Sequence, residues 1–170
     1  IFPIQFVTAM LWPSGYSFSQ NAISDLGVAV CGEFSEQGNQ IRDVCSPAHA
    51  LFNSGMVLTG ALLLIGSVLL YGYWPTMLGR IAVMCMAIAS ICVVAVGLLP
   101  WNTEPELHDL FAFGQALFQW AAMLLIAAVV GRGASRWLTV GALILSLVGF
   151  LLFILALDGI EVLSFGIAER

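Results

Sequence analysis

The stretch CSPAHALFNSGMVLTGALLLIGSVLL, residues 45–70, decides the fold of this chain. Residues 47–71 contain no Asp, Glu, Lys or Arg over 25 positions, and roughly 20 mainly apolar residues are enough for an α-helix to cross a bilayer. His49 and Asn53 stand near its start, four positions apart, so a helix places both side chains on one face. The stretch therefore predicts a membrane-spanning helix that begins with a polar face.

The whole chain has the composition of an integral membrane protein. Of its 170 residues, 61% are hydrophobic and only 9% are charged, whereas soluble domains contain about 25% charged residues. A soluble fold of this length leaves roughly a third of its unfolded surface exposed to water, so it could not hide so much apolar surface. The net charge is −5 and no Lys is present, which excludes the cation clusters typical of nucleic-acid binding.

Further apolar runs repeat the pattern of the first one. They are continuous and lack period-2 alternation, which favours helices over barrel strands, and their short links favour antiparallel neighbours in a bundle. We predict an all-α, polytopic transmembrane bundle forming one domain, residues 1–170, with an outward loop at 13–46 and spans at about 1–12, 47–71, 77–99, 106–130 and 136–157. The run 1–12 covers only about half of a bilayer core, so that span is expected to be partial.

The few charges are sorted by the predicted links. The links after the second and fourth spans carry Arg80, Arg132 and Arg136 and no acid. The other loops carry one cation, Arg42, and most of the acids: Asp25, Glu33, Glu36, Asp43, Glu104, Glu106, Asp109, Asp158 and Glu161. The positive-inside rule predicts a multi-pass plasma-membrane protein with the Arg links in the cytoplasm and the acidic loops outside.

A disulfide is predicted between Cys31 and Cys45, which flank the segment 32–44 of the outward loop. The oxidising exterior favours such a bond. A metal site at this pair is disfavoured because the spacing is wide and no second ligand pair stands nearby.

Four motifs connect the chain to a known family: YSFSQNAISDLG (16–27), CSPAHALFN (45–53), VGLLPWNTEPELH (96–108) and GIAER (166–170). With these motifs in this order, the chain resembles the domain of unknown function 998 family, small multi-helix membrane proteins of bacteria and archaea. The resemblance covers nearly the whole chain. It implies about six helices and a bacterial plasma membrane, but no established activity. In the family pattern a last hydrophobic helix follows the final motif, so we expect this sequence to be trimmed at both ends.

The same motifs place polar side chains at the outward membrane boundary. Because they come from several packed helices, we expect them to lie close together and to form a ligand-binding cluster: Asp25, His49, Asn53, Asn102, His108 and Gln115. Gln115 and Gln119 continue the face of His108 into the membrane. This stripe is either interhelical hydrogen bonding or the wall of an outward-opening polar cavity.

Three functions remain open for the cluster. In the first, the polar residues are structural: they cap helices and connect loops. Ser46-Pro47, for example, is typical of an N-cap followed by Pro at the first helical position. Such a protein would suit the role of an accessory subunit of a membrane complex. Free donors would suit a binder of lipid or of a small polar ligand. Both interpretations are non-catalytic, and the expected partners are membrane lipids and other membrane subunits.

The alternative is a metal-dependent membrane hydrolase that acts on lipid. His49 and His108 with Asp25 or Asp109 could hold zinc with an open coordination position. No dense signature such as His-Glu-x-x-His occurs. We therefore predict no cofactor and place the non-enzymatic functions first.

Overall fold

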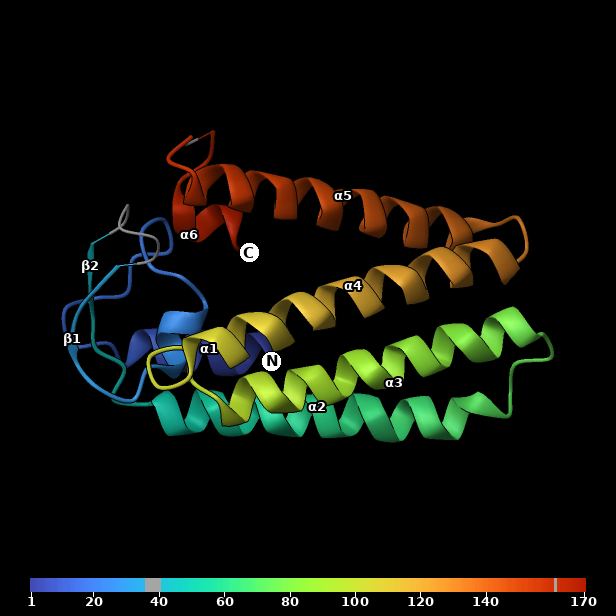
Figure 1. Ribbon diagram of the computed structural model, residues 1–170, viewed down its shortest axis with the longest axis horizontal. Helices are drawn as coiled ribbons and strands as arrows, with labels where there is room; N and C mark the ends of the chain where they lie inside the picture. The colour runs from blue at the N-terminus through green and yellow to red at the C-terminus, as the bar shows by residue number, and fades with distance from the viewer. Residues whose placement is uncertain (36–40, 161) are drawn as a thin grey trace.

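The computed structural model describes residues 1–35, 41–160 and 162–170. Within these ranges four long helices run alongside one another in alternating directions (Figure 1): α2 (His49–Tyr71), α3 (Met77–Leu98), α4 (Pro105–Val129) and α5 (Ala134–Leu157). Each is long and apolar enough to cross a membrane. The predicted all-α, polytopic bundle is therefore confirmed. The four complete spans expected from the sequence match these helices to within two residues at each end.

The shorter elements gather at one end of the bundle, on the left of Figure 1. They are α1 (Phe2–Met10), the 3₁₀ turn η1 (Ser24–Gly27), the strands β1 (Gly32–Phe34) and β2 (Arg42–Val44), and α6 (Phe165–Ala168). The loops here enclose a small apolar core, made by Ala9, Trp12, Leu26, Val28, Val44 and Phe52. We call this end the cap; it comprises the described residues 11–35, 41–48, 99–104, 158–160 and 162–170.

A disulfide closes the hairpin of the cap. Cys31 and Cys45 are bonded, with their Cα atoms 4.2 Å apart, as the sequence predicts. β1 and β2 pair antiparallel between them, with Gly32 opposite Val44. The bond therefore lies directly beyond the last strand pair and holds β2 beside β1.

The start of α2 differs from the expectation. Its N-cap is Ala48 and no side chain caps it. The Ser46 hydroxyl instead donates to the carbonyl oxygen of Leu26 at 2.7 Å. Ser46 therefore connects the loop before α2 to η1, and Pro47 lies before the first residue of the helix.

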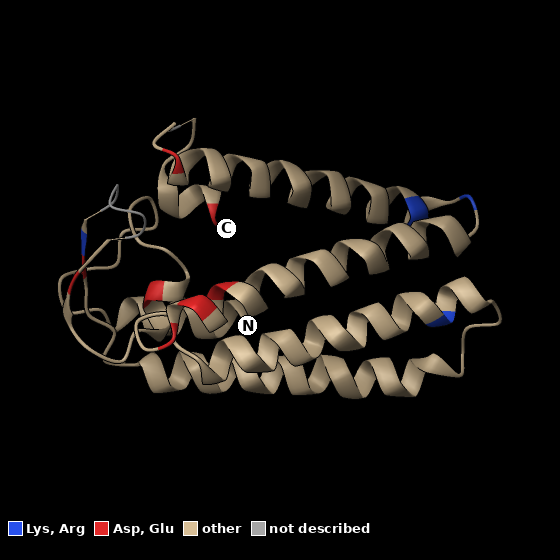
Figure 2. Ribbon diagram, in the orientation of Figure 1, with Lys and Arg blue, Asp and Glu red and all other residues tan. Residues whose placement is uncertain are grey.

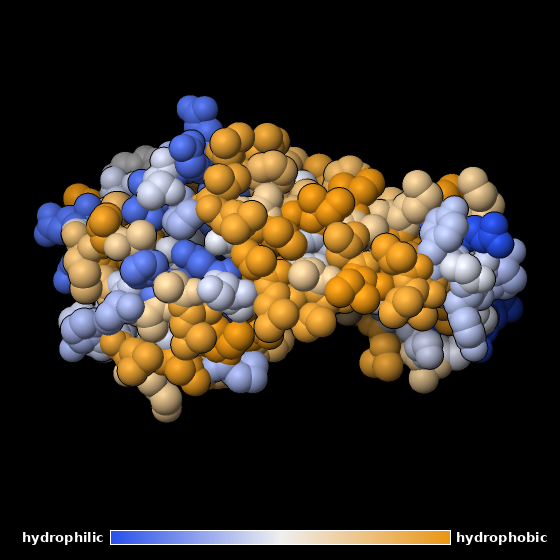
Figure 3. Space-filling view, turned by 90° about the horizontal axis from the view of Figure 1, so that it is seen from below, coloured by the Kyte–Doolittle hydropathy of each residue, from blue (hydrophilic) through white to orange (hydrophobic). Residues whose placement is uncertain are grey.

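Charges separate to the two ends of the bundle (Figure 2). Arg80, Arg132 and Arg136 lie at the end away from the cap. The described acids lie at the cap end, where Arg42 and Arg170 also lie: Asp25, Glu33, Asp43, Glu104, Glu106, Asp109, Asp158 and Glu169. Glu36 and Glu161 lie outside the described residues. Between the ends, Figure 3 shows a broad apolar belt, as a membrane-embedded protein requires.

Close helix packing is strongest between α2 and α3. A Cβ added at Gly60 of α2 would lie 2.7 Å from the carbonyl oxygen of Ser90 and 2.8 Å from the amide nitrogen of Val94, both in α3. The missing side chain thus lets the two backbones approach, as small residues do in membrane helices.

In contrast, α5 diverges from α4 toward the cap (Figure 1). Aromatic contacts join the two helices: Phe150 of α5 lies 5.1 Å from Trp120 and 6.0 Å from Phe113, ring centroid to ring centroid. The Trp120 indole N–H also donates to the Ser146 hydroxyl at 2.9 Å. α5 is therefore held by a few large side chains, with space left between them.

We predict that Gly60→Leu destabilises the bundle by about 1–3 kcal/mol, because the added side chain collides with the α3 backbone. Unfolding titrations in mixed micelles would measure the loss. Gly66→Leu is the matched control, because nothing lies within 4 Å of a Cβ at Gly66 in the same helix. Equal losses in the two variants would contradict this account of α2–α3 packing.

Candidate functional site

A buried ion pair lies at the centre of the cap. Asp25 of η1 is fully buried and Arg42 of β2 is 7% exposed. The guanidinium donates through Nε to Oδ2 and through Nη2 to Oδ1, both at 2.7 Å. Oδ2 also accepts from the Ala22 amide at 2.9 Å and from the Asn21 side chain at 3.3 Å. These charge-assisted bonds compensate the cost of burying the carboxylate.

The Arg42 guanidinium connects distant parts of the chain. It lies over the Trp101 ring at 5.6 Å and over the Phe165 ring at 4.9 Å. Trp101 belongs to the link between α3 and α4, and Phe165 begins α6. The hairpin, η1, this link and α6 therefore meet at one cation, through bonds and cation–π contacts.

The two predicted histidines lie at the cap end of the bundle, each bonded to the main chain. Nδ1 of His49 is 2.9 Å from the Ser46 carbonyl oxygen, and Nδ1 of His108 is 2.7 Å from that of Leu99. Because a carbonyl only accepts, Nδ1 carries the proton in both rings. Both rings thus tie the start of a long helix to the loop before it.

The two predicted asparagines also serve the main chain. The Asn53 amide donates to the Gly27 carbonyl oxygen at 3.0 Å, and the Asn102 side-chain oxygen accepts from the Ala29 amide at 3.4 Å. The structure thus brings these four predicted site residues to the cap end of the bundle, where their side chains hydrogen-bond to main-chain groups of the loops.

The described part of the chain contains no group of three or more His, Cys, Asp and Glu that could hold a metal ion. Asp25 is engaged by Arg42, and Asp109 is exposed on the first turns of α4. The geometry of these residues therefore gives the zinc alternative no support.

Gln115 and Gln119 bond to each other along α4, Nε2 of Gln115 donating to Oε1 of Gln119 at 2.8 Å. Helical geometry sets them opposite the exposed Leu110, Leu117 and Leu124 of the same helix. The amide pair thus faces the inside of the bundle and not the lipid.

The sequence interpretation does not pick out a second polar network, in which α6 joins the cap. The Glu169 carboxylate accepts from the Ile23 amide. Arg170 donates to the carbonyl oxygens of Phe18 at 2.8 Å and of Asn21 at 3.2 Å, and to the Tyr16 hydroxyl. Burial raises the pKa of Tyr16, so the hydroxyl stays neutral. One sequence signal points to this network: the GIAER motif, which contains both Glu169 and Arg170.

Gly166 brings α6 against the loop after α1. Its amide donates to the Ser19 carbonyl oxygen at 3.0 Å. A Cβ at this position would lie 2.7 Å from the carbonyl oxygen of Phe18. Only glycine therefore permits this approach.

A cavity of about 610 Å³ opens between α4, α5 and α6. Its walls are mainly apolar and include Ala116 and Trp120 of α4 and Ala142, Ser146 and Gly149 of α5. Glu169 and Arg170 also line it. The cavity thus combines an apolar wall in the membrane-spanning part with charged groups at the cap.

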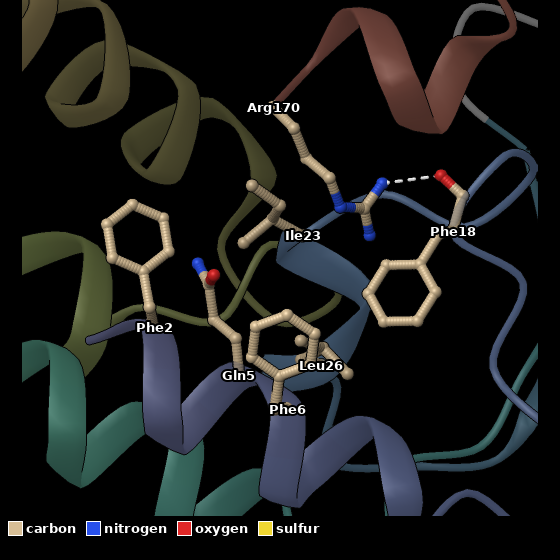
Figure 4. Close-up of a pocket in the computed structure, with 7 residues that line it drawn as sticks. All are labelled: Phe2, Gln5, Phe6, Phe18, Ile23, Leu26 and Arg170. Carbon is tan, nitrogen blue, oxygen red and sulfur yellow. Dashed lines mark hydrogen bonds between the residues drawn. The ribbon is translucent and has the colours of Figure 1, made fainter.

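A smaller pocket of about 210 Å³ lies on the other side of Arg170. Figure 4 shows Phe2, Gln5 and Phe6 of α1 on one side and Phe18 and Arg170 on the other. The guanidinium turns toward the Phe18 carbonyl oxygen. The Gln5 amide and the Arg170 guanidinium therefore lie among aromatic rings.

We predict that Asp25→Asn destabilises the protein by about 3–5 kcal/mol, because the Arg42 charge is left buried without its counter-ion. Unfolding titrations in mixed micelles would measure this, with Asp43→Asn, on the exposed neighbour of Arg42, as the control. Adding Arg42→Gln to Asp25→Asn should recover part of the loss. Equal losses of stability in Asp25→Asn and Asp43→Asn would contradict the claim that the Asp25–Arg42 ion pair stabilises the cap.

Comparison with known proteins locates the chain in a family. No curated protein and no solved structure gives a match. The model of the family described as "Protein of unknown function (DUF998)" matches residues 1–170, which is the whole chain. The resemblance carried by the four motifs is therefore confirmed, and this membrane-embedded protein belongs to the DUF998 family.

Proposed function

We propose that the protein is a non-catalytic membrane protein that binds lipid in the cavity between α4 and α5. The cavity itself carries the proposal. Its volume of about 610 Å³ falls within the roughly 300–1,000 Å³ of small-molecule sites. Because it lies among membrane-spanning helices, a lipid reaches it sideways from the bilayer without crossing water.

The wall of the cavity suits an acyl chain. Ala142, Ser146 and Gly149 are small residues on the α5 side, and nothing lies within 4 Å of a Cβ at Gly149. The Ser146 hydroxyl and the Trp120 indole bond to each other. In this bond the indole N–H donates and the hydroxyl oxygen accepts, so an apolar chain beside it does not leave the indole donor orphaned.

The location of the site departs from the sequence hypothesis. His49, Asn53, Asn102 and His108 bond to main-chain groups, which supports a structural role for them. The charged end of the cavity, Glu169 and Arg170, lies at the cap, and we propose that this end meets the headgroup of the lipid.

A second candidate function is that of an accessory subunit. Ala142, Ser146 and Gly149 are spaced by four and three residues on α5, and such small-residue faces also allow another membrane helix to approach closely. In that case a partner helix would fill the cavity. Gentle extraction would then recover a fixed protein partner, whereas the lipid proposal expects bound lipid on the isolated protein.

We predict that Gly149→Phe greatly reduces the amount of lipid that co-purifies, because the ring fills the open space at this position without a clash. Native mass spectrometry after gentle extraction would count the bound lipids. Gly141→Phe is the matched control. It adds the same ring to α5 at a glycine that is also open and does not belong to the cavity lining.

Equal lipid content in the two variants and the wild type would refute the proposal. Loss of a protein partner from Gly149→Phe, with no lipid in the wild type, would favour the accessory-subunit function instead.

We further propose that the cap faces the outside of the plasma membrane. Two features support this orientation: the three arginines of the opposite end, Arg80, Arg132 and Arg136, and the disulfide of the cap. The proposal concerns sidedness only, and it is tested independently of the ligand.

We predict that Glu104→Cys reacts with a membrane-impermeant maleimide in intact cells, whereas Arg132→Cys reacts only after permeabilisation. Both changes would be made with Cys85 and Cys92 replaced by Ala, since these are the free thiols. Labelling would be read by mass shift. The opposite pattern would reverse the orientation.

A further inference from the structure

Arg170 lies where two spaces meet. It lines both the 610 Å³ cavity between α4 and α5 and the 210 Å³ pocket beside α1. The other residues of the two linings differ. A molecule that occupied both spaces would therefore pass beside Arg170, whose guanidinium is drawn at the edge of the smaller pocket in Figure 4.

The hydrogen bonds of Arg170 leave one edge of its guanidinium available. Nη1 donates to the carbonyl oxygens of Phe18, Asn21 and Gly166, and Nη2 donates to the Tyr16 hydroxyl. Within the described ranges, Nε–H and one N–H of Nη2 have no acceptor. Arg42 hydrogen-bonds to Asp25 through the same edge of its own guanidinium, Nε and Nη2.

The acceptors that hold Arg170 are neutral groups. Carbonyl oxygens and a protonated phenol orient the cation but do not neutralise it, and the Tyr16 and Phe18 rings fix its plane, 5.3 and 5.1 Å away. A guanidinium so oriented, exposed and with a free edge fits a planar pair of anionic oxygens. Glu169 is engaged elsewhere, at the Ile23 amide.

Gln5 supplies a second polar group. Its side chain lines the smaller pocket, on the α1 side facing Arg170 (Figure 4), and in the described part of the chain its amide makes no hydrogen bond. An amide beside three phenylalanines calls for a polar partner from the ligand. The ester carbonyls of a glycerolipid, next to its phosphate, have this chemistry.

We propose that Arg170 binds the phosphate of a phosphate-bearing glycerolipid, with one acyl chain in the larger cavity and Gln5 beside the glycerol esters. The inference rests on the proposed lipid-binding function and names the lipid class. Lipid without a phosphate fills the same apolar wall but leaves the guanidinium edge unpaired.

The test compares two lipids that differ only in the phosphate: phosphatidic acid and diacylglycerol with the same acyl chains. Purified full-length protein in detergent would be titrated with each lipid and measured by native mass spectrometry. We expect the wild type to bind phosphatidic acid about tenfold or more tightly than diacylglycerol, as charge-assisted bonds predict. Arg170→Gln should lose this preference and keep diacylglycerol binding. Arg136→Gln, at the other end of α5, should keep the preference.

Each outcome separates the two proposals. Arg170→Gln with an intact preference, or a wild type without preference, would overturn the role of Arg170 while lipid binding stands. A wild type that binds neither lipid would overturn both. Arg170 also holds the cap, so Arg170→Gln could change the fold. Arg170→Lys controls for this because it keeps the positive charge, and it should therefore retain part of the preference for phosphatidic acid.

Discussion

The bidentate bond between Arg42 and Asp25 is the constraint on which the cap depends. A carboxylate with no exposed surface is tolerable only with a counter-ion and further donors. The chain supplies the counter-ion from β2 and the donors from Asn21 and Ala22, just before η1. The same guanidinium also makes cation–π contacts with the rings of Trp101 and Phe165. One ion pair thus sets the hairpin, the α3–α4 link and α6 relative to one another, and Glu169 and Arg170 of the candidate site directly follow α6.

Two solvents act on the two parts of the molecule. In the membrane-spanning part the bilayer replaces water, so exposed leucines are stable and helices satisfy their own main chain. The cap has irregular loops, whose main-chain groups need partners. His49, Asn53, Asn102 and His108 provide such bonds. Polar residues that look like a binding site from sequence are therefore used mainly to complete loops, and the lipid site that we propose lies between α4 and α5 instead.

The sequence predicts the helices well because an apolar run of bilayer length has few other stable structures. The bond between Cys31 and Cys45 was predictable because the loop is predicted to face an oxidising exterior and because the wide spacing disfavours a metal site. The pairing of Asp25 with Arg42 was not predictable from periodicity, because the two residues are 17 positions apart and neither belongs to a long helix. The cavity could not be predicted from the sequence either, because it results from the divergence of α5 from α4. The sequence around Ala142, Ser146 and Gly149 does not encode this divergence.

The disulfide has a consequence for the order of assembly. Arg42 lies between Cys31 and Cys45, so a closed ring confines the guanidinium to the neighbourhood of η1 and raises its effective concentration at Asp25. Without the bond, the cation must find its carboxylate by diffusion of an open loop, at the entropic cost of closing it. In the proposed orientation, with the cap outside the membrane, oxidation of the hairpin would therefore favour the pairing of Arg42 with Asp25 and so the maturation of the cap.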